Sequence, residues 1–88
     1  MYKIEFSNLA AKELEKVFYA DRKLYSRLYA AIESLSVDPF QGKRLKGRLV
    51  DDYSLRVGDY RIVYTICKDR LVVYIIDLGH RKDIYKER

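Results

Sequence analysis

The spacing of hydrophobic residues changes along this chain of 88 residues. Residues 2–6 alternate between apolar and polar, as in a strand with one buried face. From there to Leu35, apolar residues recur every three or four positions, which is the period of an amphipathic helix. Beyond Pro39 the period returns to two. The pattern predicts the order β-α-α-β-β-β-β, an α+β domain in which a helical hairpin packs on a mainly antiparallel, twisted sheet.

Two N-cap residues indicate where the helices begin. Ser7 follows the first strand and Asp21 interrupts the helical stretch, and both side chains can accept a hydrogen bond from the first turn of a helix. The apolar stripes of the two helices are Ala10, Ala11, Leu14, Val17 and Phe18, then Leu24, Leu28, Ala31, Ile32 and Leu35. Because only a short turn separates the helices, we expect them to form an antiparallel pair.

The second half of the chain is expected to form four strands. They cover residues 44–49, 53–57, 60–67 and 70–78, and the first of them is a short basic strand or an extended loop. Gly58-Asp59 suits a two-residue hairpin turn, and Lys68-Asp69 is the expected next turn. A short helical or extended tail follows residue 78. The length favours a single domain over residues 1–88.

The Gly58-Asp59 turn predicts which side chains share a face of the sheet. If these two residues are the whole turn, Arg56 lies directly opposite Arg61. The set on this face, expected to be open, is Ser54, Arg56, Arg61, Val63 and Thr65, and the more apolar opposite set packs under the helices. Two adjacent guanidinium groups repel each other unless an anion binds between them. The pair therefore indicates a phosphate site, or two arginines that point into water or pair with Asp59 and Asp77.

Positive charge is concentrated in the second half of the chain. Residues 43–88 carry twelve basic and seven acidic side chains, whereas residues 1–42 carry six of each, so the whole net charge of +5 lies in the second half. This asymmetry indicates a polyanionic partner such as a nucleic acid, or a mildly basic solvated surface. The most basic segment holds Lys43, Arg44, Lys46 and Arg48. It could bind a nucleic-acid backbone, or protect an edge strand with charge.

The end of the chain combines three chemical groups just past the last predicted strand. His80 is the only histidine and can transfer a proton near neutral pH, Arg81 can hold a phosphate, and Tyr85 can orient a phosphate or stack on a base. These groups suit RNA chemistry without a metal, or an exposed tail. One histidine and one cysteine cannot form the usual zinc site, so we expect no metal or cofactor. A lone Cys67 forms no internal disulfide and fits the cytoplasm, and no apolar run is long enough to span a membrane.

Several motifs resemble the RelE toxins of the RelE/ParE family of toxin–antitoxin systems. They are Leu45-Lys46-Gly47, Tyr53-Ser54-Leu55-Arg56, Gly58-Asp59-Tyr60-Arg61-Ile62-Val63-Tyr64 and Gly79-His80-Arg81-Lys82-Asp83-Ile84-Tyr85. The resemblance covers essentially the whole chain. It implies an endoribonuclease that cuts mRNA in the ribosomal A site through attack by the ribose 2′-OH, without a metal. It also implies a cognate, RelB-like antitoxin with an acidic segment.

The resemblance assigns roles to individual residues. Arg56 and Arg61 would bind the phosphate, Arg81 would stabilise or protonate the leaving group, and Tyr85 would orient the phosphate or stack on a base. His80 is the candidate general base, or a residue that positions its neighbours. The basic segment containing Lys43, Arg44, Lys46 and Arg48 would contact ribosomal RNA.

One departure from the RelE pattern keeps two alternatives open. Ser54 stands where well-known members carry a second basic residue two positions before Arg56. One alternative is a ParE-like toxin that inhibits DNA gyrase and has no ribonuclease activity. The other is an inactive relative that only binds an antitoxin.

Overall fold

A computed structural model describes residues 1–45 and 52–80 of the chain. The elements follow the predicted order, with a short 3-10 turn, η1, added after the helices. They are β1 (Lys3–Phe6), α1 (Asn8–Ala20), α2 (Arg22–Ser34), η1 (Pro39–Gln41), β2 (Lys43–Arg44), β3 (Asp52–Val57), β4 (Tyr60–Cys67) and β5 (Val72–His80). The α+β class and the element order are therefore confirmed.

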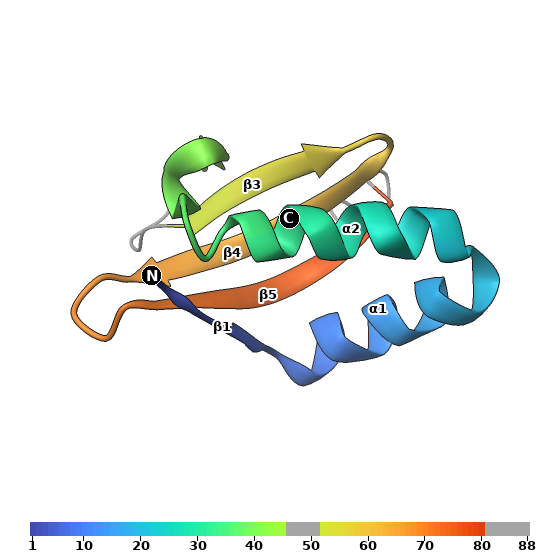
Figure 1. Cartoon of the computed structure of the whole chain (residues 1–88), viewed down its shortest axis with the longest axis horizontal. Helices are drawn as coiled ribbons and strands as arrows, with labels where there is room; N and C mark the ends of the chain where they lie inside the picture. Colours follow the sequence, from blue (N-terminus) through green and yellow to red (C-terminus); the bar gives the residue numbers. More distant parts are fainter. Residues whose placement is uncertain (46–51, 81–88) are drawn as a thin grey trace.

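The five strands form one open sheet with the order β1-β5-β4-β3-β2. β1 runs parallel to β5, and the other neighbours are antiparallel. Both helices lie on the same side of the sheet (Figure 1). We call this side the helix side and the opposite side, which carries Arg56 and Arg61, the arginine face.

Single residues control how the helical hairpin starts and turns. The Ser7 hydroxyl accepts a hydrogen bond from the Ala10 N–H (3.0 Å) and donates one to the Ile76 carbonyl (2.6 Å), which ties the start of α1 to β5. Asp21 ends α1 by donating its backbone N–H to the Val17 carbonyl (2.8 Å), and its carboxylate caps α2 at Leu24 (3.1 Å). Both predicted N-caps are confirmed. Neither described helix has the length and apolar character needed to cross a bilayer.

The hydrophobic core lies between the helices and the sheet. α1 and α2 contribute residues such as Leu14, Leu28 and Ile32, and these pack against the apolar side chains of the central strands β4 and β5. Ile62, Tyr64 and Ile66 of β4 all face the helix side, as the predicted register requires. Each fully buried leucine or isoleucine contributes roughly 1.5–3 kcal/mol relative to an exposed one. The core therefore fixes which face of β3 and β4 is left for function.

Several predicted strand limits are corrected by the structure. The first strand begins at Lys3, one residue later than expected, and β3 begins at Asp52, one residue earlier than expected. The basic strand begins at Lys43 and does not include Leu45, while residues 46–49 of its predicted range lie outside the described residues. The last strand spans Val72–His80 and not residues 70–78. Residues 68–71 all belong to the preceding turn, where Leu71 adopts a left-handed conformation (φ 53°) and accepts a hydrogen bond from the Lys3 N–H. The predicted tail falls outside the described residues.

Tyr64 fastens η1 and β2 to the sheet from inside the core. Its hydroxyl donates a hydrogen bond to the Pro39 carbonyl (2.7 Å) and accepts one from the Gly42 N–H (3.2 Å). Gly42 has to be small, because an added Cβ would lie 2.5 Å from the Tyr64 hydroxyl oxygen and 2.9 Å from the Ser54 carbonyl oxygen. Burial, with smaller effects from Tyr53 and Asp38, raises the pKa of Tyr64 to about 12 against the opposing effect of the Gly42 hydrogen bond. This contact positions the basic residues of β2.

The Tyr64→Phe substitution should lower the free energy of unfolding by about 1–3 kcal/mol at neutral pH, because Pro39 and Gly42 lose their buried partner. The wild type should lose stability between pH 10 and pH 12, since the unfolded chain ionises this phenol first. The phenylalanine variant has no phenol at this position and lacks this loss. The difference in unfolding free energy between the two proteins should therefore narrow as the pH rises from 10 to 12. Urea unfolding monitored by circular dichroism measures both effects. Tyr19→Phe, at a side chain 78% exposed, is the control and should match the wild type.

Candidate functional site

The β3–β4 hairpin brings two arginines together at one end of the arginine face. Arg56 pairs directly with Arg61, and Val57 pairs with Tyr60, which confirms the predicted two-residue turn. Gly58 adopts the left-handed conformation that this turn needs (φ 60°). The Arg56 side chain is exposed, and its Nε donates a hydrogen bond to the Gly58 carbonyl (3.1 Å). The Arg56 guanidinium is therefore fixed to the turn, and Arg61 is its direct cross-strand partner on the same face.

Gly79 completes the row that contains the two arginines. It is the β5 partner of Arg61, so the row reads Arg56, Arg61, Gly79 across three strands. No described atom would lie within 4 Å of a Cβ added at Gly79. The row thus combines two positive side chains with a position that has no side chain and is itself buried.

The neighbouring row on the arginine face is less open than the sequence predicted. It contains Lys43, Ser54, Val63 and Asp77 on β2 to β5. Ser54 and Val63 are only 3% and 1% exposed, so the expectation that this whole face is open was wrong. On the arginine face, Arg56 and Lys43 are exposed, whereas Arg61 is half-buried and Gly79 is buried.

Asp52 is a second buried polar residue on the arginine face, and the sequence did not single it out. It pairs with Thr65 two positions along β3 from Ser54, and it is 4% exposed. In the sequence, Asp51-Asp52 looks like part of a polar loop, so only the strand pairing shows that this carboxylate is enclosed. The arginine-face residues of β3 are Asp52, Ser54 and Arg56, and Asp52 is the one farthest from the β3–β4 turn.

The structure does not place His80 with the arginine pair. His80 belongs to β5 and pairs with Tyr60, so both side chains are on the helix side, while Gly79 shares the face of Arg61. The rings of Tyr60 and His80 meet edge to face, with their centroids 6.0 Å apart. The prediction that His80 lies just past the last strand was wrong, because β5 continues far enough to pair with the start of β4. The sheet itself separates the imidazole from Arg56 and Arg61.

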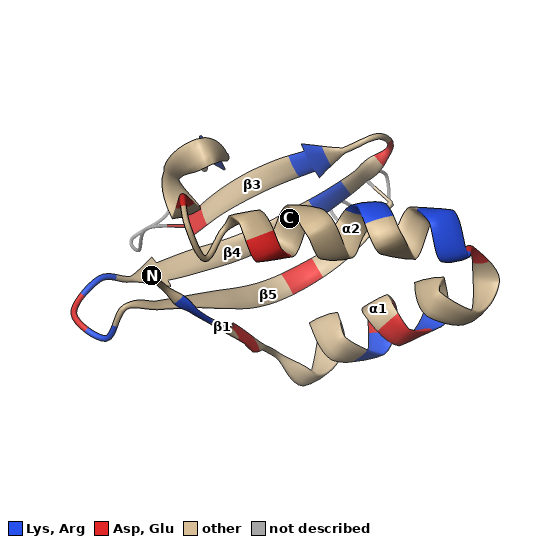
Figure 2. Ribbon diagram, viewed as in Figure 1, with Lys and Arg blue, Asp and Glu red and all other residues tan. Residues whose placement is uncertain are grey.

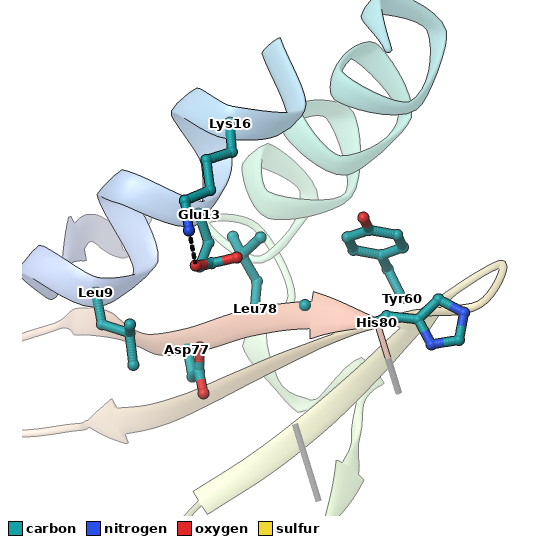
Figure 3. A pocket seen from close by; sticks show the side chains of 8 residues that line it. Leu9, Glu13, Lys16, Tyr60, Asp77, Leu78 and His80 are labelled. Carbon is teal, nitrogen blue, oxygen red and sulfur yellow. Dashed lines mark hydrogen bonds and ion pairs between the residues drawn. The ribbon is translucent and has the colours of Figure 1, made fainter. Parts of the chain in front are cut away.

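His80 and Tyr60 line a hollow of about 390 Å³ between α1 and the end of β5 (Figure 3). The other residues around it are Leu9, Glu13, Lys16, Asp77, Leu78 and Gly79. Lys16 and Glu13, both on α1, form an ion pair at the edge of this hollow (3.1 Å). The lining carries two carboxylates, those of Glu13 and Asp77, and one lysine, so it is a poorer match for a phosphate than the arginine face.

The residues of the basic segment that the structure describes point to opposite faces. Lys43 pairs with Ser54 and therefore lies on the arginine face, whereas Arg44 pairs with Tyr53, which is on the helix side. Both are exposed. Lys46, Arg48, Arg81 and Tyr85 lie outside the described residues, so their predicted roles stay predictions.

Basic segments gather around the β3–β4 turn (Figure 2). The end of β3, the start of β4 and the first half of α2 carry lysine or arginine and lie at the same end of the molecule. Arg27 of α2 belongs to this group, because its guanidinium lies against Gly58. The sequence did not single it out, since its proximity to the turn arises only from tertiary packing.

The chemistry available at this end is the binding of an anion with closely spaced negative oxygens. Guanidinium groups present fixed forks of N–H donors that match a phosphate. Cations held in place before a reaction can also stabilise charge that develops in its transition state. An adjacent pair of guanidiniums at an exposed hairpin end is therefore suited to bind a phosphodiester and to promote its cleavage.

Comparisons with known proteins show which family this chain resembles. The family model described as the ParE toxin of the type II toxin–antitoxin system parDE matches residues 4–85. The toxin RelG of Mycobacterium tuberculosis is 34% identical over 86 residues, covering 97% of each chain. The mRNA interferase toxin RelE of Escherichia coli is 31% identical over 91 residues, covering 98% of this chain and 92% of that one. The toxin–antitoxin complex RelBE2 of M. tuberculosis contains a similar structure, with 28% identity, a TM-score of 0.78, and coverage of 91% of this chain and 98% of the matched chain.

Proposed function

The chain belongs to the RelE/ParE family of type II toxin–antitoxin toxins, and from this premise we propose that it is an endoribonuclease that cleaves mRNA in the ribosomal A site and so inhibits translation. Family membership alone does not distinguish a ribonuclease from a gyrase inhibitor, since the matching family model is described as ParE and three relatives of this chain carry RelE names. The geometry of the arginine face favours the ribonuclease.

The adjacent pair of Arg56 and Arg61 is the observation that supports this function. The two residues are direct partners across the β3–β4 hairpin, and Arg56 is fixed to the turn through Gly58. Like charges placed directly opposite each other destabilise a sheet, and an anion bound between them relieves their repulsion. A binding site for a phosphodiester is therefore consistent with the two arginines standing opposite each other here.

The proposed reaction is an in-line transesterification. The ribose 2′-oxygen forms a bond to the adjacent phosphorus, the bond from phosphorus to the 5′-oxygen breaks, and a 2′,3′-cyclic phosphate remains. The 2′-OH proton is transferred to a base, and the departing 5′-oxygen acquires a proton. Arg56 and Arg61 bind the phosphate and stabilise the charge that develops on it. No metal enters this scheme.

The resemblance to RelE assigns the remaining steps to the C-terminal residues. Arg81 stabilises or protonates the leaving oxygen, and Tyr85 orients the phosphate or stacks on a base. His80 lies on the helix side, so we propose that it positions the end of β5 through Tyr60 and does not remove the 2′-OH proton. The ribosome would then hold the RNA in the reactive geometry. This positioning compensates for the lack of an assigned general base on the toxin.

Lys43 offers a replacement for the basic residue that Ser54 lacks. It is the cross-strand partner of Ser54 and projects on the same face, one row from Arg56 and Arg61. A lysine on the neighbouring strand can bring its ammonium group over a serine, because directly opposed residues are the closest neighbours on a sheet. The charge missing from β3 is therefore supplied by β2, which Tyr64 holds in place.

Lys43→Ala should reduce cleavage on the ribosome roughly tenfold, which is the size expected for one charge-assisted phosphate contact. Arg44→Ala removes the same charge from the next residue, but on the helix side, and is the matched control. Single-turnover cleavage of a defined message measures the difference. If the two variants lost cleavage rate equally, the charges of β2 would contribute only a general attraction for RNA. Lys43 would then not belong to the phosphate site.

A cognate antitoxin is the proposed protein partner. The relative in the RelBE2 structure is bound to an antitoxin, and an acidic segment would complement the basic end of this chain. We propose that this segment covers the arginine face and blocks RNA. A fully assembled complex that still cleaved mRNA at the rate of the free toxin would rule out this arrangement.

Induction of the toxin in growing cells tests the function against its alternatives. Primer extension on a translated message should show discrete cuts within codons and only where translation occurs. Intact messages together with broken DNA would support the gyrase inhibitor, and intact messages without DNA damage or growth arrest would support an inactive antitoxin-binding relative.

A further inference from the structure

A third arginine, Arg27, lies at the β3–β4 turn although it comes from α2. A Cβ atom built on Gly58 would lie 3.3 Å from Nη2 and 3.7 Å from Nη1 of Arg27, so the guanidinium rests on the backbone of the turn. The same residue, Gly58, accepts the hydrogen bond from Arg56 through its carbonyl. One turn residue is therefore contacted by two guanidiniums, one from the sheet and one from the helical hairpin.

The guanidinium of Arg27 lies beside the turn, and its donors remain available. The side chain is exposed, and within residues 1–45 and 52–80 it makes no ion pair and no hydrogen bond. Asp59 is the acidic residue of the same turn, and no ion pair joins it to Arg27. An arginine carries five N–H donors in a planar fork that fits a phosphate. Its place beside Gly58 therefore uses none of these donors within the described residues.

We propose that Arg27 binds the RNA backbone on the helix side of the β3–β4 turn, at a phosphate next to the one held by Arg56 and Arg61. This inference rests on the proposed ribonuclease function and extends its binding site from the arginine face over the turn to α2. A strand of RNA that passes over Gly58 meets all three guanidiniums in succession. The absence of a side chain at Gly58 leaves room for the Arg27 guanidinium beside the turn.

The Arg27→Gln variant tests this contact, because glutamine keeps a polar side chain against Gly58 and removes the charge. The probe is a short single-stranded RNA made resistant to cleavage by a 2′-deoxy sugar at the scissile position. The slope of log K against log salt should fall in magnitude by about 0.7, the value for one phosphate contact on a single strand. Arg27→Lys should restore most of that slope. Arg70→Ala, which removes an exposed arginine from the β4–β5 turn, should keep the wild-type slope.

Ribosome-dependent cleavage measured in parallel separates this inference from the proposed function. Wild-type cleavage combined with an unchanged slope for Arg27→Gln would overturn the role of Arg27 and leave the ribonuclease intact. A lowered slope in a toxin that never cleaves mRNA would preserve the RNA contact and overturn the nuclease. Equal losses of slope from Arg27→Gln and Arg70→Ala would show nonspecific attraction and would also overturn the inference. A changed urea midpoint for Arg27→Gln together with an unchanged slope would assign Arg27 to holding the turn.

Discussion

Replacing Arg61 by alanine is expected to lower mRNA cleavage on the ribosome by on the order of 100- to 1,000-fold, the loss typical of one removed donor to a transition state. Arg61 projects on the arginine face, away from the helices, so its loss removes charge and little of the core. The protein should therefore stay folded. Single-turnover cleavage of a message on programmed ribosomes, together with circular dichroism, measures both parts of the prediction.

The control for Arg61→Ala is Arg70→Ala, which removes the same kind of side chain at the opposite hairpin turn and should leave cleavage unchanged. Arg61→Lys keeps a charge but loses the fork geometry and should restore only part of the rate. Near wild-type cleavage by a folded Arg61→Ala protein would contradict the assignment of the phosphate site to the arginine pair.

Alanine substitutions of the neighbouring residues His80 and Arg81 should reduce mRNA cleavage to different degrees. Arg81→Ala is expected to cost on the order of 100- to 1,000-fold in cleavage if its guanidinium stabilises the leaving oxygen, as the resemblance to RelE implies. His80→Ala should cost less than about tenfold, because the strand pairing places the imidazole on the helix side, away from Arg56 and Arg61. The same single-turnover assay compares the two variants.

The pH dependence of the rate supplies a second test of His80. A general base near neutral pH would give a rate that rises with an apparent pKa close to that of histidine, and His80→Ala would abolish the rise. We expect the alanine variant to keep the pH profile of the wild type. If His80→Ala lost both the pH dependence and most of the cleavage rate, His80 would be the general base. That result would contradict its role as a positioning residue.

Local sequence signals predicted the part of the site that depends on the β3–β4 hairpin. Gly58 allows a two-residue turn, this turn fixes the pairing of Arg56 with Arg61, and alternation then assigns every residue of the two strands to a face. The N-caps at Ser7 and Asp21 were predictable for the same reason, because the signal and its effect lie within a few residues.

Features that depend on tertiary contacts escaped prediction. The length of β5 is set by pairing with β4, and an error of two residues at its end moved His80 from a tail to the helix side of the sheet. The burial of Ser54 depends on its neighbours across the sheet. The position of Arg27 depends on how α2 packs over the turn. No local pattern in the sequence contains this information.

The most direct test of the central claim is the mapping of cleavage products on purified ribosomes that carry a defined codon in the A site. We expect the wild-type toxin to cut within that codon, to leave a 2′,3′-cyclic phosphate, and to leave the same message intact in the absence of ribosomes. The Arg61→Ala protein should give no cut above background on this timescale. An intact A-site codon after incubation with folded wild-type toxin would contradict the proposal that this chain is an mRNA endoribonuclease.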